Sequence, residues 1–279
     1  VAAWNSFLFD NFSWDLTLKD LNLRTWNADY EGLEDSSSLA LLIVHNLGNI
    51  VNVPLLKRKY PNCVFVEDNC EGLFGKYEDK HSGTQSLCSS LSFFGNKNIT
   101  TGEGGAFLTN DSSLFHYISK IKCQGETHKR YIHDELGYNY RMTNIQAAIL
   151  LGQLEEIDKI KENKKRVFDL YRKELDKIDG VTNQHIEKDT THSMWMIAAR
   201  FSPKYFSLNE LEEDLNTNRV ETRRMFYPHT YHNHLKIKGD VEVSTKINKE
   251  VLMLPSYPEL KDVEIKKICS IIFNHQMNY

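Results

Sequence analysis

Short apolar runs alternate with amphipathic segments through the first half of the chain. Continuous apolar runs at 39–44 and 63–66 predict strands that are buried on both faces, and residues 90–94 and 105–109 predict two more strands. A short helix is expected between the first two runs, over 54–60. Strands that alternate with helices in this way are typical of an α/β domain with a mostly parallel sheet.

A long helical pattern starts at Thr143–Gln146, which has the spacing of a capping box, and continues to about Lys177. Gly180 is expected to end this helix. We interpret the helix as the connection between two domains. The first, residues 1–165, is expected to be a large α/β domain that is incomplete at its N-terminus, and the second, residues 166–279, a smaller α+β domain.

After residue 180 the hydrophobic pattern changes to shorter segments. In chain order, the sequence predicts a strand over 194–201, a helix over 208–218 that begins with a capping box at Ser207–Glu210, a strand over 219–226, an irregular loop over 227–239, and a helix from Asp262 to about His275.

Composition and charge exclude several classes of function. The chain has 279 residues, of which 41% are hydrophobic, so it can bury a substantial core. Its net charge is −4, from 34 basic and 38 acidic residues, and its short basic runs lie among acids. This balance argues against a nucleic-acid partner, because such proteins carry a basic patch or stripe.

The cysteines and the hydropathy pattern indicate a cytoplasmic protein. The five cysteines form no Cys-x-x-Cys pair, so their spacing suits neither a disulfide framework nor a zinc site. No apolar stretch approaches the roughly 20 residues of a membrane span, and no secretory signal pattern is present at the N-terminus. Reduced thiols and no membrane partner are therefore expected, and the start at Val1 suggests processing or a missing start.

Lys97 is the strongest candidate for chemistry. It follows the apolar segment 90–94 and precedes a turn rich in glycine, 102–105. An amine that loses hydration in such a place becomes a candidate nucleophile toward a carbonyl carbon. The structural alternative is a lysine whose stem lies along the strand end while its charge reaches water.

Two further polar residues are candidates for the same site as Lys97. Asp68 follows the run 63–66, so its carboxylate is expected at the carboxyl end of a strand, where ligands bind in open α/β sheets. Asp68 is equally suited to cap the next helix. Ser92 lies five residues before Lys97 and offers a hydroxyl to a phosphate, although a serine beside a turn is usually structural.

Several segments together resemble the sugar aminotransferases of the DegT/DnrJ/EryC1/StrS group, in the order of that family and along nearly the whole chain. The matching segments are Val66–Gly72, Ser92–Gly105, Leu136–Ala148, Glu221–Pro228 and Leu254–Leu260. The resemblance implies the type I fold of the transferases that depend on pyridoxal 5'-phosphate (PLP), similar to aspartate aminotransferase. This fold has a large sheet domain and a smaller C-terminal domain.

The resemblance also implies roles for individual residues. Lys97 would bind PLP covalently through its amine and then move a proton between the cofactor and the sugar carbon. Asp68 would pair with the pyridine nitrogen and keep it protonated, which makes the ring an electron sink. Ser92 would hold the cofactor phosphate, and Asn139 would do the same from the neighbouring subunit, so a homodimer is expected. Glu71 occupies a position near the phenolic oxygen of the cofactor, with a surface carboxylate as the structural alternative.

The lysine loop distinguishes two reactions within the resemblance. Related sugar 3-dehydrases carry histidine where the aminotransferases carry the reactive lysine, and this chain has Lys97. The resemblance therefore implies transfer of an amino group, normally from glutamate, to a nucleotide-linked keto sugar. The loop is most similar to those of enzymes that act on a 4-keto-6-deoxy sugar, such as perosamine or viosamine synthases. Arg223, Tyr227 and His229 lie where family members contact substrate, and solvated side chains are the alternative.

The front of the chain departs from the family pattern. Members have about 70 residues before the position that aligns with Val1, including a Ser-Gly-Thr turn whose amides grip the phosphate. Ser82–Thr84 is not a replacement, because it lies between Asp68 and Lys97, where the family has an unrelated turn. An aromatic cluster near the start is interpreted either as core or as an exposed patch; it consists of Trp4, Phe7, Phe9, Phe12 and Trp14.

Two classes of function remain open from the sequence. One is an active aminotransferase. The other is a catalytically incompetent relative that acts as a binding or assembly partner, favoured by the missing phosphate turn. The joint retention of the four family residues favours the enzyme; these are Asp68, Ser92, Lys97 and Asn139.

Overall fold

The computed structural model of the chain describes residues 17–31, 33, 40–233 and 239–278, and the early aromatic cluster lies outside the described residues. By their internal contacts the residues form two compact units. One comprises 34–160 with 189–195, and the other comprises 1–33, 161–188 and 196–279. The division into domains at residue 165 stays a prediction.

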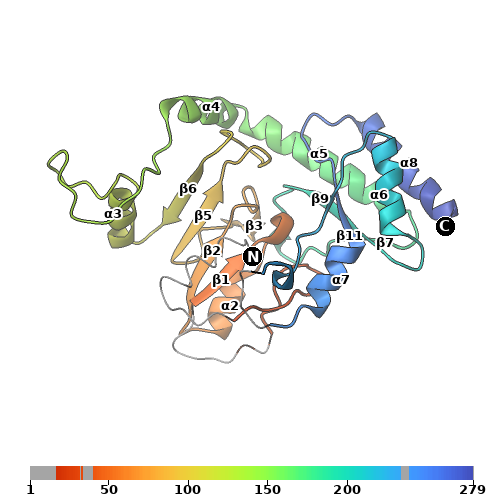
Figure 1. The fold of residues 1–279 in the computed structure, drawn as a ribbon, viewed down its shortest axis with the longest axis horizontal. Helices are drawn as coiled ribbons and strands as arrows, with labels where there is room; N and C mark the ends of the chain where they lie inside the picture. Colours follow the sequence, from red (N-terminus) through yellow and green to blue (C-terminus); the bar gives the residue numbers. More distant parts are fainter. Residues whose placement is uncertain (1–16, 32, 34–39, 234–238, 279) are drawn as a thin grey trace. The chain divides into compact units, whose positions relative to one another are not determined.

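The first unit is built on a mixed sheet of four strands in the order β1-β2-β5-β6 (Figure 1). The first three strands run parallel, and β6 is antiparallel to β5. A second small sheet has the order β4-β3-β8. The elements of this unit are β1 (Ala40–Val44), η2 (Asn46–Gly48), α2 (Val53–Lys59), β2 (Val64–Asp68), β3 (Lys76–Tyr77), β4 (Lys80–His81), β5 (Cys88–Ser92), β6 (Gly105–Thr109), α3 (Ser112–Ile121), α4 (Asn144–Glu155), the start of α5 (Ile157–Leu175) and β8 (Thr190–Thr191).

The expected burial of the first two strands on both faces is wrong. Ile43 and Phe65 are 0% and 3% exposed, but Leu42 and Val64 are 50% and 46% exposed. Successive side chains of a strand point to opposite faces. One face of the sheet is therefore packed, and the other is open at these positions among the described residues.

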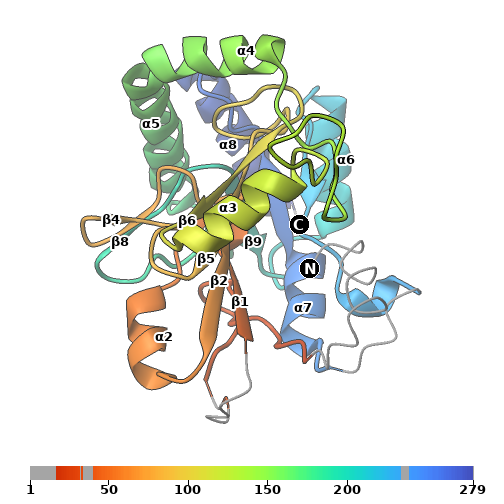
Figure 2. The same cartoon turned by 90° about the vertical axis from the view of Figure 1, so that its left-hand side faces the viewer.

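Under the packed face, Phe74, Phe93 and Ile99 form a hydrophobic cluster with partly buried residues of β5, β6, α4 and α5 around it. The cluster anchors the loop between β5 and β6 at its start, through Phe93, and near its middle, through Ile99. Figure 2 shows α3 lying over β6, with the loop that follows it reaching away from the sheet in Figure 1.

The second unit contains an antiparallel sheet with the order β10-β11-β9-β7. Helices α6, α7 and α8 accompany it, and Ile265, Ile268 and Ile272 of α8 are almost fully buried. The elements of this unit are the rest of α5, β7 (Val181–Asn183), β9 (Ile197–Phe201), α6 (Leu208–Thr217), β10 (Arg223–Arg224), η3 (His229–Tyr231), α7 (Glu242–Glu250), β11 (Val251–Leu254) and α8 (Asp262–Asn278).

The capping box at Thr143 is confirmed, because its hydroxyl accepts from the Gln146 N–H while the Gln146 side chain bonds back to the cap. The predicted single helix is in fact two, α4 and α5, which meet at Glu156 outside the helical region (φ −101°, ψ 13°). Helix α5 ends at Leu175, so Gly180 does not end it. Gly180 instead takes a positive φ of +78° in the turn before β7.

Three predictions in the second half need correction. The strand expected over 194–201 begins only at Ile197, and the strand expected over 219–226 shrinks to Arg223–Arg224. Helix α6 forms where expected, but Ser207 makes no capping hydrogen bond with its side chain. The reason is that spacing identifies a helix start, whereas the rotamer and the neighbouring contacts decide whether the hydroxyl faces the amides. Among the described helices, none is long and apolar enough to cross a membrane.

Candidate active site

Lys97 lies in the turn that joins β5 to β6. Its N–H donates to the carbonyl of Phe94 at 3.0 Å, and Phe93 closes the turn by donating to Gly104 at 2.9 Å. Gly102 adopts a φ of +78°, a conformation that favours glycine. The Lys97 side chain is only 12% exposed. The sequence correctly predicted an amine that is largely withdrawn from water.

The Lys97 ammonium has two close neighbours from distant parts of the chain. Its Nζ lies 3.8 Å from Oε1 of Glu71. The same atom lies 4.1 Å from the centre of the Trp195 ring, within the range of a cation–π contact. Glu71 follows β2 and Trp195 follows β8, so the fold gathers this group from three segments.

Glu71 is a buried carboxyl with an unusual titration. Its Oε2 accepts a hydrogen bond of 2.7 Å from the Leu47 N–H. Burial raises the pKa of Glu71 to about 7, assisted by the negative charge of Asp68 and opposed by Lys97 and the Leu47 bond. The carboxyl therefore changes charge near neutral pH beside an amine, which is the setting expected of groups that exchange or hold protons.

Asp68 is the last residue of β2, at the carboxyl end of a strand as predicted. Its Oδ1 accepts from the Cys70 N–H at 3.1 Å. Burial first, and the charge of Asp68 second, raise the pKa of the Cys70 thiol to about 12, while the charge of Lys97 opposes the rise. Asp68 and Lys97 therefore act on the same thiol, which stays protonated at neutral pH.

Ser92 ends β5 and is partly buried. Its Oγ accepts from the Phe94 N–H at 3.3 Å, so the hydroxyl is held at the start of the lysine turn. This bond leaves the hydroxyl hydrogen able to serve an acceptor such as a phosphate oxygen.

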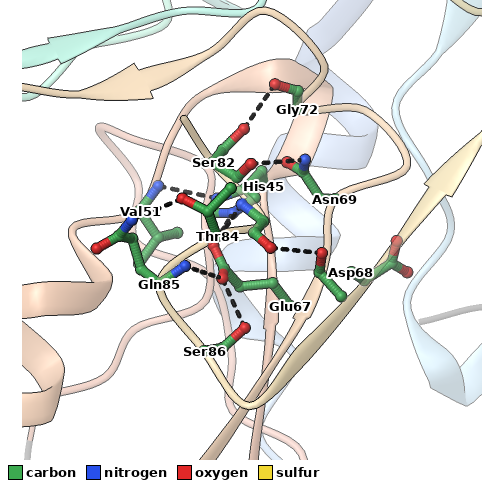
Figure 3. A network of polar contacts seen from close by, with 12 residues as sticks. His45, Val51, Glu67, Asp68, Asn69, Gly72, Ser82, Thr84, Gln85 and Ser86 are labelled. Carbon is green, nitrogen blue, oxygen red and sulfur yellow. Dashed lines mark hydrogen bonds and ion pairs between the residues drawn. The ribbon is translucent and has the colours of Figure 1, made fainter. Parts of the chain in front are cut away.

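Beneath these groups lies a polar network centred on Glu67 (Figure 3). Its carboxylate, 1% exposed, receives bonds from His45 Nε2 at 3.1 Å, the Gly83 N–H at 2.8 Å, the Gln85 N–H at 3.2 Å and the Ser86 hydroxyl at 2.6 Å. Val51 donates its N–H to the other His45 nitrogen at 3.1 Å. These bonds fix the turn after β1 against the turn before β5.

The segment Ser82–Thr84 has the same Ser-Gly-Thr sequence as the phosphate-binding turn of the family, but its polar groups take part in this network. Gly83 directs its N–H at Glu67, and the Ser82 hydroxyl donates to the carbonyl of Gly72 at 2.8 Å. Both groups are engaged inside the protein, which agrees with the expectation that this segment does not replace the phosphate turn.

The remaining predicted residues lie apart from this cluster or in the other unit. Asn139 is exposed in the segment between α3 and α4, where it forms an isolated bridge with Cys123. In the other unit, Arg223 is exposed and pairs with Glu221 at 3.2 Å. Also there, Tyr227 is 54% exposed, and the buried Nε2 of His229 has no partner among the described residues.

Sequence reasoning missed Trp195 and Ser193. The apolar run that contains Trp195 was assigned to a strand of the second domain, whereas residues 189–195 pack within the first unit. The polar residues immediately before this run were the available signal that the strand starts later. Among the described residues, no group of histidine, cysteine and carboxylate side chains is arranged to hold a metal ion.

Comparison with known proteins identifies the family and the fold of the chain. The model of the DegT/DnrJ/EryC1/StrS aminotransferase family matches residues 17–273. GDP-perosamine synthase of Escherichia coli O157:H7 is 34% identical over 267 residues, which cover 94% of this chain and 70% of that protein. The enzyme of the same name from Caulobacter vibrioides is 33% identical over 266 residues, covering 91% and 71%.

Among solved structures, Helicobacter pylori PseC, an aminotransferase involved in the biosynthesis of pseudoaminic acid, superposes with a TM-score of 0.88 at 21% identity. The match covers 98% of this chain and 76% of that one. At this identity the match concerns the fold alone, and it confirms the fold class that the sequence predicted.

Proposed function

The chain belongs to the DegT/DnrJ/EryC1/StrS aminotransferase family, and from this membership we propose that it transfers an amino group from glutamate to a nucleotide-linked 4-keto-6-deoxy sugar. The observation that carries the proposal is the withdrawn amine of Lys97, which lies beside Glu71 and shares a neighbourhood with Asp68. Transamination requires an amine that can bond to an aldehyde and then move a proton, and a carboxylate at a strand end is suited to hold the ring nitrogen of the cofactor.

The family uses PLP, and the residues of the site fit that group. Asp68 offers a carboxylate at a strand end, suited to the cationic nitrogen of a pyridine ring. Ser92 offers a hydroxyl for a phosphate, and Lys97 offers an amine for the aldehyde. When bound, PLP supplies an electron sink for the carbon that gains or loses the amino group.

Individual residues of the chain would have separate roles in the reaction. Asp68 would hold the pyridine nitrogen of PLP through an ion pair, and the Cys70 N–H holds the Asp68 carboxylate in place. Lys97 would accept a proton from one carbon and donate it to another. The low exposure of Lys97 and Glu71 keeps water from the proton that is being moved.

Reduction and mass mapping test the enzyme assignment. PLP is added to this chain and to a version with its natural upstream sequence, the sample is reduced with borohydride, and the modified peptide is located by mass spectrometry. An adduct at Lys97 in the longer version is expected, and Lys97→Ala is the matched control. Absence of the adduct from the longer version contradicts the enzyme assignment and favours a non-catalytic binding role.

The relatives in Escherichia coli and Caulobacter vibrioides are named as GDP-perosamine synthases, and we extend that substrate class to this chain. Arg223, Tyr227 and His229 are the residues we assign to the sugar nucleotide. The test is conversion of a panel of nucleotide-linked keto sugars, with glutamate as amino donor. Conversion of a 4-keto-6-deoxy sugar is expected. Reaction only at another carbon would contradict the substrate assignment while leaving transamination intact.

We also infer that the active form is a homodimer in which Asn139 reaches the partner's cofactor. Support comes from an apolar surface on the first unit, which we name the α3–α4 surface. Helix α4 has no buried residue despite its apolar sequence. Large exposed apolar patches mark association sites. The exposed side chains of this surface are Phe115, Tyr117, Tyr131, Ile132, Leu136, Tyr138, Tyr140, Ile145, Ile149, Leu151 and Leu154.

A further inference from the structure

Trp195 lies where it can hold the reactive amine, although nothing in the sequence pattern marks it as a site residue. The face of its indole is 4.1 Å from Lys97 Nζ, and the residue is 5% exposed. A cation over an aromatic face is attracted by the ring quadrupole, and the attraction grows as water is removed. The indole face is therefore placed to hold the Lys97 ammonium by a cation–π contact.

The position of the indole is fixed by hydrogen bonds at both ends of the residue. Its ring N–H donates to the carbonyl of Asn96 at 2.8 Å, one residue before the lysine. Its backbone N–H donates to Ser193 Oγ at 3.3 Å. Because the ring is tied to the lysine turn itself, Trp195 and Lys97 keep their relative positions.

Ser193 links the backbone of Trp195 to the backbone of Glu71. Its hydroxyl donates to the carbonyl of Glu71 while accepting from Trp195, and Ser193 is fully buried. Asn98 donates to the Ser193 carbonyl at 2.9 Å and to the Leu73 carbonyl at 3.1 Å. One serine therefore sets the separation between the two groups that contact the amine.

We propose that Glu71 and Trp195 form a resting site that holds the protonated amine of Lys97 whenever this amine is not bonded to the cofactor. This inference rests on the proposed transamination, since in that reaction the lysine must be released and must carry a proton before returning it. Among the described residues, the charged groups that act on the Glu71 carboxyl are Lys97, which favours its ionised form, and Asp68, which opposes it.

The test uses the cofactor-free chain and measures how fast acetic anhydride acylates Lys97 relative to the exposed Lys80, located by mass spectrometry. Only an uncharged amine is acylated, so loss of the resting site should speed the reaction. We expect Trp195→Leu to raise the Lys97 to Lys80 ratio at pH 7 roughly three- to tenfold, from the size of cation–π contacts. Trp195→Phe retains an aromatic face and should change the ratio less than about twofold.

The pH dependence of the ratio distinguishes an effect of the Glu71 charge from a change in steric access to Lys97. In the wild-type chain the ratio should fall between pH 6 and pH 8, because ionisation of Glu71 strengthens its hold on the ammonium. In Glu71→Gln the ratio should be flat over this range, whereas a change in steric access alone would not depend on pH. If circular dichroism shows that Trp195→Leu fails to fold, Glu71→Gln provides the test of the resting site.

Equal ratios in all variants, or an unchanged pH dependence in Glu71→Gln, would overturn the resting site. These measurements need no cofactor. Failure of the proposed function, seen as no borohydride adduct at Lys97, is therefore a separate result from failure of this inference.

Discussion

At the scale of single residues, the hydrogen bonds that a carboxyl receives decide whether its pKa is raised or lowered. Glu67 and Glu71 are four residues apart and both buried, yet the pKa of Glu67 is lowered and that of Glu71 is raised to about 7. Burial raises both values. For Glu67, bonds from His45, Ser86 and the Gly83 N–H outweigh the effect of burial, whereas for Glu71 the Leu47 bond and the charge of Lys97 at 3.8 Å do not outweigh it.

Replacing Glu67 tests the structural half of this contrast. Glu67→Gln turns an NH₂ group toward donors, so the free energy of unfolding should fall by about 2–4 kcal/mol at pH 7. The exposed Glu103→Gln is the control and should change it by less than about 0.5 kcal/mol. Both are measured by urea unfolding of the cofactor-free chain.

The difference in stability between wild type and Glu67→Gln should depend on pH. The folded pKa of Glu67 lies below its ordinary 4.5, so its contribution is present above pH 4.5 and is lost as the pH falls through the folded value. The gap between wild type and Glu67→Gln should therefore narrow on acidification below pH 4.5. A constant gap would contradict the assignment of the stabilisation to the ionised form.

Folding disfavours the ionised form of Lys164, whereas it favours the ionised form of Glu67. Lys164 is 4% exposed and donates to the Ser256 carbonyl at 2.6 Å; burial lowers the pKa of this lysine to about 7, opposed by Glu259. Between pH 7 and 10.5 the unfolded chain holds a proton that the folded chain lacks, so wild-type stability should rise across this window.

Lys164→Met removes that titration. The stability of this variant relative to wild type should be greatest below pH 7 and should decline by up to roughly 4 kcal/mol toward pH 10.5. The exposed Lys165→Met is the matched control, with no such trend. Unfolding by urea at pH 6, 8 and 10 checks the result, and parallel curves would contradict it.

At the scale of elements, short turns position the site more than helices do. The η2 turn presents the Leu47 N–H to Glu71, and its Gly48 carbonyl accepts from the Ser193 N–H at 2.8 Å. Gly48 has a φ of +92°, and a Cβ there would lie 1.9 Å from Ser193 Oγ and 3.0 Å from the Glu71 carbonyl. Both the conformation and the space require glycine.

Gly48→Ala should therefore lower the free energy of unfolding by about 2–4 kcal/mol and reduce retention of PLP on dialysis. Gly152→Ala is the control, because it lies within α4 with nothing within 4 Å of the added carbon, and it should stabilise the chain by about 0.5–1 kcal/mol. Thermal unfolding ranks the two. Equal stability of both variants would show that the turn tolerates a side chain.

At the scale of the whole molecule, the α3–α4 surface predicts association. Leu136 and Ile145 are 82% and 76% exposed, so Leu136→Glu and Ile145→Asp should convert the proposed dimer to monomer in sedimentation experiments. Leu55→Glu, on α2 outside this surface, is the control and should leave the dimer intact. Dimers that survive both substitutions would place the interface elsewhere.

Much of the architecture could be predicted from the chain. Residues 105–109 form the strand that was expected, and Thr143 caps its helix as its spacing indicates. Local preference sufficed there, because strand alternation and capping involve neighbours in sequence. The break at Glu156 and the short β10 were missed, since packing from other segments decides where an element stops.

The sequence by itself determined the family and its cofactor class, because several segments resemble that family in order along the chain, and it singled out Lys97 as the candidate reactive amine. Only the tertiary structure decided what surrounds that amine. Trp195 lies nearly one hundred positions downstream, and Leu47 acts through a backbone N–H that any residue would supply. Contacts made across such separations, or by the main chain, leave no periodic pattern along the sequence.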